Sequence, residues 1–309
     1  MKMKQNVSTG GMPVKNMLYL ILATFIWGVA FVAQSIGGEE IDAFAYTGIR
    51  FLMGAAVLVP FVAVRRRRRV CVPDRNTKEA DVADGRRTVI GGILCGIFLA
   101  AAALLQQIGI DHVDVGKAGF LTALYIIIVP CLSFLLTKRS RAKVWIAVVL
   151  ALCGLYFLCM EPGDTFSIGP WEWCLIACAL MFAIQILLID HFSTGVDPIE
   201  MACVEFLTAG VIGTAIAAAQ ENLSLTGVSS GALLALLYSG ILSSGVAYTL
   251  QILGQKGADP SIASLIMSLE APISAVAGFV ILRQALSLWE LLGCVLMSAA
   301  IVLAQMPER

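Results

Sequence analysis

The stretch IDAFAYTGIRFLMG (residues 41–54) places an arginine, Arg50, inside an apolar run that continues to Val64. An ionised side chain near the centre of a bilayer costs roughly 2.5–3.5 kcal/mol on insertion scales, so it is expected to face the protein interior or a water-filled cavity. The whole chain favours that setting, because 59% of its 309 residues are hydrophobic and only 14% are charged. Soluble domains carry about 25% charged residues. Arg50 is therefore expected to lie in a membrane helix and to face the protein interior or a water-filled cavity.

Apolar segments long enough to cross a bilayer recur along the chain. A helix needs about 20 apolar residues to span the hydrocarbon core. The sequence predicts ten such helices, at residues 17–36, 43–64, 88–110, 117–136, 144–160, 171–189, 199–219, 231–253, 261–282 and 288–305. The first is predicted to stay in the mature protein, because it has no small-residue cleavage site and further spans follow it. The prediction is an all-α polytopic membrane protein with a single membrane domain.

The lysines and arginines predict the orientation of these helices. Basic residues that flank short loops stay on the cytoplasmic side. With both termini cytoplasmic, eighteen of the 21 lysines and arginines fall on that side. The run RRRRR (residues 65–69) begins where the second helix ends, which favours a topology anchor beside anionic lipid headgroups over a nucleic-acid site. We therefore predict a multi-pass protein of the cytoplasmic membrane with its N- and C-termini in the cytoplasm.

The two halves of the chain resemble each other weakly but in consistent order. A shift of 155 residues places residues 41–54 on VDPIEMACVEFLTA (residues 196–209), and Arg50 then meets Glu205. Further along, LQQIG (residues 105–109) meets LQILG (residues 250–254), and Pro130 meets Pro272. Each half holds five helices, an odd number, so the second half must cross the membrane in the opposite sense. Inverted repeats of this kind are typical of secondary transporters. We predict two inverted five-helix repeats, at residues 17–160 and 171–305.

This plan and three short motifs resemble the drug/metabolite transporter superfamily, EamA type. The motifs are WGVAF (residues 27–31), GIRFLMGA (residues 48–55) and SLEAP (residues 268–272). The resemblance covers nearly the whole chain, from about residue 17 to residue 305. It implies transport of a small molecule, since members export or import amino acids, other small metabolites and drugs.

Three formal charges, Arg50, Glu205 and Glu270, lie well inside the predicted spans. From a helical rise of about 1.5 Å per residue, all three occupy the middle third of the bilayer. We predict that the helices of Arg50 and Glu205 meet near the pseudo-twofold axis and that this pair lines the substrate cavity. The alternative is that the pair only braces two helices. In the functional interpretation, Arg50 binds a carboxylate and Glu270 or Glu205 carries a proton.

Weaker candidates surround these charges. Trp27, Tyr125 and Tyr248 lie deep in predicted spans, where they either line the substrate site or simply fill the core. Gln106, Gln107 and Gln251 are polar groups nearer helix ends. Pro130 and Pro272 are expected to bend the fourth and ninth helices at matching points, because a proline removes one backbone hydrogen bond.

The function predicted from these features is secondary active transport by alternating access. The expected substrate is an amino acid, a related polar or amphipathic solute, or a drug, with export coupled to a proton or solute gradient. No P-loop, catalytic triad or metal-binding spacing occurs, so we expect no enzyme activity, cofactor or metal. The alternatives are a channel, a lipid scramblase or a structural membrane protein. Expected partners are the substrate, membrane lipids, protons and a second copy of the chain, but no nucleic acid.

Overall fold

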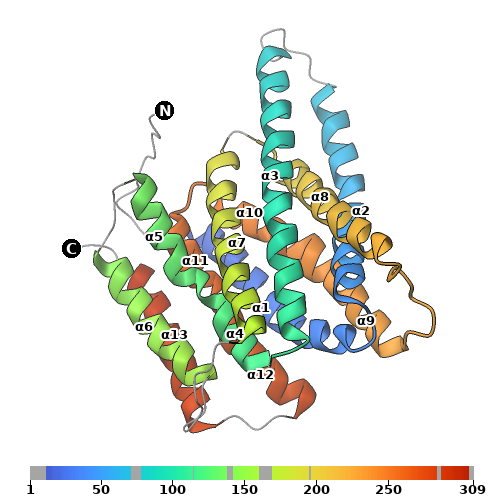
Figure 1. Cartoon of the computed structure of the whole chain (residues 1–309). Coiled ribbons are helices and arrows are strands. Elements are labelled where there is room, and N and C mark those ends of the chain that lie inside the picture. Colours follow the sequence, from blue (N-terminus) through green and yellow to red (C-terminus); the bar gives the residue numbers. More distant parts are fainter. Residues whose placement is uncertain are drawn as a thin grey trace.

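The computed structural model describes residues 12–70, 78–113, 115–137, 142–159, 169–194, 196–283 and 287–305, and every regular element in them is a helix (Figure 1). Met160, where the first repeat is predicted to end, lies outside this part of the chain, as do the side chains of Arg68 and Arg69. The elements of the first half are α1 (Val14–Gly38), α2 (Ala43–Val70), α3 (Lys78–Ile110), α4 (Val115–Ala123), α5 (Tyr125–Thr137) and α6 (Ala142–Cys159). Those of the second half are α7 (Pro170–Phe192), α8 (Pro198–Ala219), α9 (Ser230–Tyr238), the π-helix η1 (Ser239–Ala247), α10 (Tyr248–Gln255), α11 (Pro260–Met267), α12 (Glu270–Leu282) and α13 (Leu288–Gln305).

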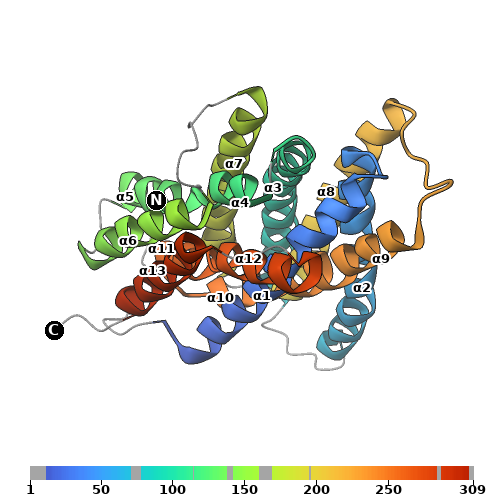
Figure 2. The ribbon, with the colours of Figure 1, turned by 90° about the horizontal axis from the view of Figure 1, so that it is seen from below.

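These elements form ten spans, because three of the spans are interrupted helices. The interrupted spans are α4–α5, α9–η1–α10 and α11–α12. Eight of the ten are long and apolar enough to cross a membrane, with lengths of 20 to 26 residues. The remaining two, α6 and α13, have shorter apolar stretches and lie side by side at one edge of the bundle (Figure 2). The predicted all-α, ten-helix plan is confirmed.

Helix contacts occur in pairs that an inverted repeat would relate. The second span of each half contacts its equivalent, as α2 packs against α8, and the fifth spans α6 and α13 do the same. Each of the other main contacts in one half has an equivalent when the halves are exchanged. The contact of α3 with α7 is equivalent to that of α1 with the span α9–η1–α10, and the contact of α3 with α8 is equivalent to that of α2 with η1. The contact of α1 with α12 is equivalent to that of α7 with α4 and α5. Because each half has five spans, the two repeats run in opposite senses.

The contact between α2 and α8 is close because glycines face each other. A methyl group on Gly213 would lie 2.7 Å from the Gly48 Cα, and one on Gly48 would overlap the backbone of Thr214. Small residues let membrane helices approach in this way. The two helices that carry Arg50 and Glu205 therefore meet directly, as predicted.

We expect Gly48→Ala to lower the thermal unfolding midpoint of the detergent-solubilised protein. Inserting a methyl group into packed backbone typically costs about 1–3 kcal/mol. Gly119→Ala is the matched control, because apart from its chain neighbours and the nearby backbone of its own helix no atom lies within 4 Å of the position a Cβ would take there. Equal midpoints for the two variants would show that the α2–α8 contact tolerates separation.

Two spans are interrupted at corresponding places in the repeats. In the ninth span the turn falls at Ser268 and Leu269, and Pro272 is the third residue of the helix that follows. Since Pro272 has no N–H for the Ser268 carbonyl, that carbonyl accepts from Ala271 instead (3.2 Å). In the fourth span the break is at Leu124, while Pro130 lies inside α5. The break predicted at Pro130 therefore lies about 1.7 turns earlier along the helix, at Leu124.

Candidate functional site

A cavity of about 460 Å³ lies among the spans of both repeats. Its charged and amide side chains are Arg50, Glu270, Gln34, Gln106 and Gln251. Its aromatic side chains are Trp27, Phe31, Tyr125, Phe182 and Tyr248. Five of the six predicted binding residues therefore line one cavity, and Glu205 is the exception.

Arg50 of α2 lines this cavity as a buried cation. Its side chain is only 1% exposed, and its Nε and Nη2 atoms have no hydrogen-bond partner. Its guanidinium carbon lies 4.8 Å from the centroid of the Phe51 ring. Among the residues that the structure describes, no carboxylate lies within 4 Å of Arg50, since the ion pairs found there involve only Arg65 and Arg66. A buried guanidinium without a counterion is expected to bind an anionic group strongly.

The predicted Arg50–Glu205 pair is wrong in two respects. The two charges form no ion pair, and Glu205 does not line the cavity. Glu205 instead accepts a hydrogen bond from Gln185 of α7 (2.8 Å). The repeat symmetry explains the difference, because the neighbouring residues Phe51 and Phe206 stack against each other with centroids 6.3 Å apart. A twofold axis near that contact turns the two charges toward opposite sides of the helix pair.

Glu270 and Tyr125 line the cavity and connect two of the interrupted spans, α4–α5 and α11–α12. Each is the first residue after a helix break, Tyr125 in α5 and Glu270 in α12. The Tyr125 hydroxyl donates to Glu270 Oε1 at 2.8 Å. The N-terminus of a helix favours negative charge, so the first turn of α12 favours the ionised form of Glu270.

Trp27 and Tyr248 form a continuous aromatic surface of the cavity. Their rings meet edge to face at 4.8 Å, and Tyr248 also contacts the rings of Phe51 (5.8 Å) and Phe206 (6.0 Å). The Trp27 Nε1 atom is buried without a hydrogen-bond partner, as are the side-chain oxygens of Gln34 and Gln251. Buried polar atoms are nearly always satisfied. Together with the two Arg50 nitrogens, donors and acceptors thus converge on this cavity and suit a polar ligand.

The glutamines show what sequence reasoning found and what it missed. The repeat alignment places Gln106 on Gln251, and both line the cavity. Gln107 does not line the cavity; its side-chain amide donates to the backbone carbonyl of Gln34 (3.3 Å) and to Asp111 Oδ1 (3.0 Å). Gln185, which holds Glu205, was not predicted. The sequence feature that could have indicated it is its side-chain amide among the apolar residues of helix α7.

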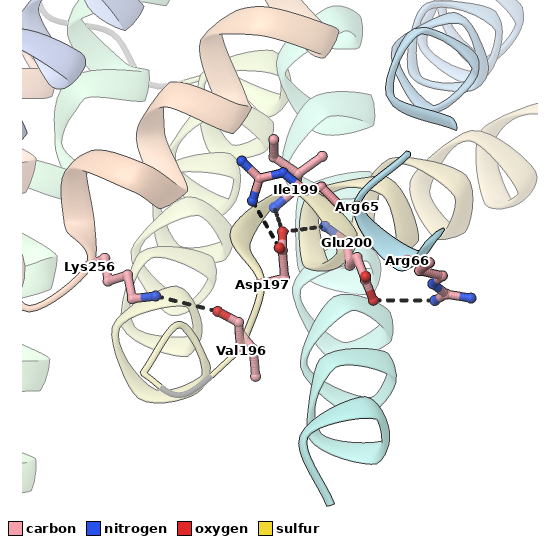
Figure 3. Close-up of polar contacts among 7 residues, drawn as sticks. All are labelled: Arg65, Arg66, Val196, Asp197, Ile199, Glu200 and Lys256. Atoms are coloured by element: carbon pink, nitrogen blue, oxygen red, sulfur yellow. Dashed lines mark hydrogen bonds and ion pairs between the residues drawn. The ribbon is translucent and has the colours of Figure 1, made fainter. Parts of the chain in front are cut away.

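Ion pairs close one end of the α2–α8 contact. Arg65 Nη1 lies 2.9 Å from Asp197 Oδ2, and Arg66 Nη2 lies 3.3 Å from Glu200 Oε2 (Figure 3). Asp197 also caps α8 by accepting from the backbone of Ile199, and Lys256 donates to the Val196 carbonyl (Figure 3). Two arginines of the basic run therefore hold helices together, a role beyond the predicted topology anchor.

Asp197 is tuned to remain ionised in this arrangement. Burial raises its pKa, but the hydrogen bonds from Arg65 and from Ile199 outweigh burial and lower the pKa below its usual range. The ionised Asp197 carboxylate therefore stabilises the folded protein at neutral pH. This stabilisation is lost as the pH falls through the lowered pKa. At the opposite end, the equivalent residue Asp42 caps α2 and accepts from Asn222 (3.3 Å). The two ends of the α2–α8 contact are thus closed by different chemistry.

Comparisons with known proteins agree on one family. The model of the EamA-like transporter family matches residues 14–160 and 169–306. An uncharacterized transporter of Archaeoglobus fulgidus is 26% identical over 94% of this chain and 85% of its own length. The uncharacterized inner membrane transporter YedA of Escherichia coli K12 is 23% identical over 90% of this chain and 87% of its own.

The fold also matches a solved structure. A crystal structure with 18% sequence identity superposes with a TM-score of 0.75, covering 94% of this chain and 96% of the other. At that identity the match concerns the fold alone. The family match covers both repeats and all the cavity-lining residues, and its members are transporters. The chain therefore belongs to the EamA-like transporter family and is a multi-pass membrane protein.

Proposed function

We propose that this protein is a secondary active transporter that binds the anionic group of a small metabolite at Arg50 and moves it across the cytoplasmic membrane by alternating access. The observation that carries the proposal is the buried Arg50 guanidinium, which faces the cavity without a counterion among the described residues. An arginine offers a planar fork of donors that matches a carboxylate. The position of the cavity between two inverted repeats supports alternating access.

The other lining residues narrow the substrate class to amino acids and related amphipathic solutes. Glu270 lines the same cavity as Arg50, so a ligand with both an anionic and a cationic group meets a complementary charge at each. Trp27 and Tyr248 supply aromatic surface for an apolar side chain. We propose that Glu270, with its hydrogen bond from Tyr125, also carries the coupling proton.

The orientation that we propose places both termini and the ion pairs of Arg65 and Arg66 in the cytoplasm. The distribution of lysines and arginines supports this orientation, because loops rich in these residues generally remain on the cytoplasmic side of the membrane. We propose export as the direction of net flux.

A substrate screen in proteoliposomes tests the function. We expect saturable, counterflow-competent uptake of at least one amino acid, and faster uptake when a proton gradient is imposed. Matched probes are L-phenylalanine, its carboxamide and phenethylamine, of which only the first keeps the anionic group. Flux that grows linearly with concentration and shows no counterflow would instead indicate a channel.

A further inference from the structure

Three buried side chains connect the cavity to Glu205. Gln251 lines the cavity, and its Nε2 donates to Gln185 Oε1 at 3.3 Å. Gln185 Nε2 in turn donates to Glu205 Oε1 at 2.8 Å. Gln251 is 2% exposed, and the other two side chains are fully buried. The chain of hydrogen bonds therefore begins at the cavity and ends on a carboxyl group in the protein interior.

The direction of these hydrogen bonds is fixed by the carboxyl group. An ionised carboxylate only accepts hydrogen bonds, whereas an amide has one accepting and one donating end. Gln185 must then turn its NH₂ to Glu205 and its carbonyl to Gln251. Gln251 must turn its NH₂ to Gln185, and its carbonyl remains for the cavity. The structure shows this arrangement, with the Gln251 Oε1 atom unpartnered.

Glu205 has the surroundings of a group that can gain a proton. Its Oε2 atom is buried and unpartnered, and no lysine, arginine or histidine lies within 4 Å of it among the described residues. The titratable groups that face it are Cys95 of α3 and Tyr248 of α10, and neither is cationic. On the side of α2, the ring of Phe51 stacks on Phe206, the residue next to Glu205. An unpaired buried carboxylate is costly, and such groups become neutral instead.

We propose that Glu205 is a second proton-binding site and that Gln185 and Gln251 transmit its protonation to the cavity as a reversal of hydrogen-bond direction. A proton on Glu205 Oε1 lets that oxygen donate to the Gln185 carbonyl. Gln185 then donates to the Gln251 carbonyl, and Gln251 presents its NH₂ to the cavity. No proton passes along the amides. One proton is bound at Glu205, and the lining of the cavity changes from an acceptor to a donor.

This reversal links proton binding to ligand choice, a consequence that rests on the proposed function. With Glu205 protonated, the Gln251 NH₂ adds a donor to the same cavity as Arg50, which favours an anionic group. With Glu205 ionised, the Gln251 carbonyl favours a ligand that donates. Because linkage is reciprocal, the anionic ligand in turn favours the proton. Gln185 is a positioning residue in this scheme, while Gln251 contacts the ligand.

Infrared difference spectroscopy between acidic and alkaline buffer tests the proposal without any ligand. The wild-type protein in proteoliposomes should show a carboxylic-acid carbonyl band that is missing from Glu205→Gln and retained in Glu270→Gln. Gln251→Leu, which leaves Glu205 and its neighbour Gln185 in place, should shift that band and move its titration midpoint to higher pH. The shift is expected because the donor that holds Gln185 in the orientation favouring the ionised carboxylate is lost.

Gln255→Leu is the matched control. Gln255 lies one turn further along α10, is 1% exposed and has no hydrogen-bond partner for either amide atom. Its replacement should leave the band unchanged. Wild-type and Glu205→Gln spectra that superimpose would overturn the proton site, and identical spectra for Gln251→Leu and Gln255→Leu would overturn the relay. Neither result depends on whether amino acids are transported.

Discussion

Arg50→Gln is expected to reduce uptake of the anionic substrate strongly at concentrations near the wild-type KM. A hydrogen bond to a charged group contributes about 1.5–3 kcal/mol, which corresponds to a loss of affinity of roughly 10-fold to 150-fold. Proteoliposome uptake over a range of substrate concentrations measures the effect. Since Arg50 lacks an ion pair in this structure, its replacement leaves no carboxylate unpaired, and the folded yield should stay near that of the wild type.

Two variants control for charge and for position. Arg50→Lys keeps the cation but loses the planar fork, so partial recovery of uptake is expected. Arg67→Gln removes an exposed arginine elsewhere on α2 and should leave uptake unchanged. Normal affinity in a folded Arg50→Gln protein would rule out Arg50 as the anion site.

Glu270→Gln is expected to abolish accumulation driven by a proton gradient while counterflow continues, with a raised KM for substrates that carry a cationic group. The amide has nearly the same shape and can still accept the hydrogen bond of Tyr125, but it cannot bind a proton reversibly. Substrate exchange needs no net proton movement, so it should survive. Uptake with and without an imposed gradient, compared with counterflow in the same vesicles, separates the two activities.

Tyr125→Phe is the companion variant to Glu270→Gln. It removes the hydrogen bond and keeps the carboxyl group, so coupling should persist with an altered pH profile. Undiminished gradient-driven accumulation in Glu270→Gln would exclude Glu270 as the proton carrier. It would also leave the separate inference about Glu205 intact, because that inference is tested by spectroscopy.

The sequence was sufficient for the plan of the fold, because length and apolar composition constrain membrane helices strongly. Arg50 and Glu270 were identifiable as cavity residues on the same ground: charges in a membrane helix must face the interior. The repeat alignment gave the wrong partner for Arg50, since an alignment shows which residues are equivalent by rotation and not which ones touch. Glu205 is the rotational equivalent of Arg50, yet its contact is Gln185.

The sequence pattern did not predict where the helices break or which contacts isolated polar residues make. The break at Leu124 has no proline or glycine beside it, whereas the turn before Pro272 has a covalent cause. Gln185 has no repeated partner that would single it out among the apolar residues of α7. The pairing of Arg65 with Asp197 depends on the long approach of α2 to α8, which a basic run alone does not reveal.

The most direct test of the account combines a change in the ligand with a change in the protein. Binding of L-phenylalanine and of its carboxamide, or of whichever substrate the screen identifies and its amide, would be measured for the wild type and for Arg50→Gln. If Arg50 binds the carboxylate, the wild type should prefer the acid by at least about tenfold, which corresponds to about 1.4 kcal/mol, and Arg50→Gln should lose that preference. An equal preference in both proteins would contradict the central claim.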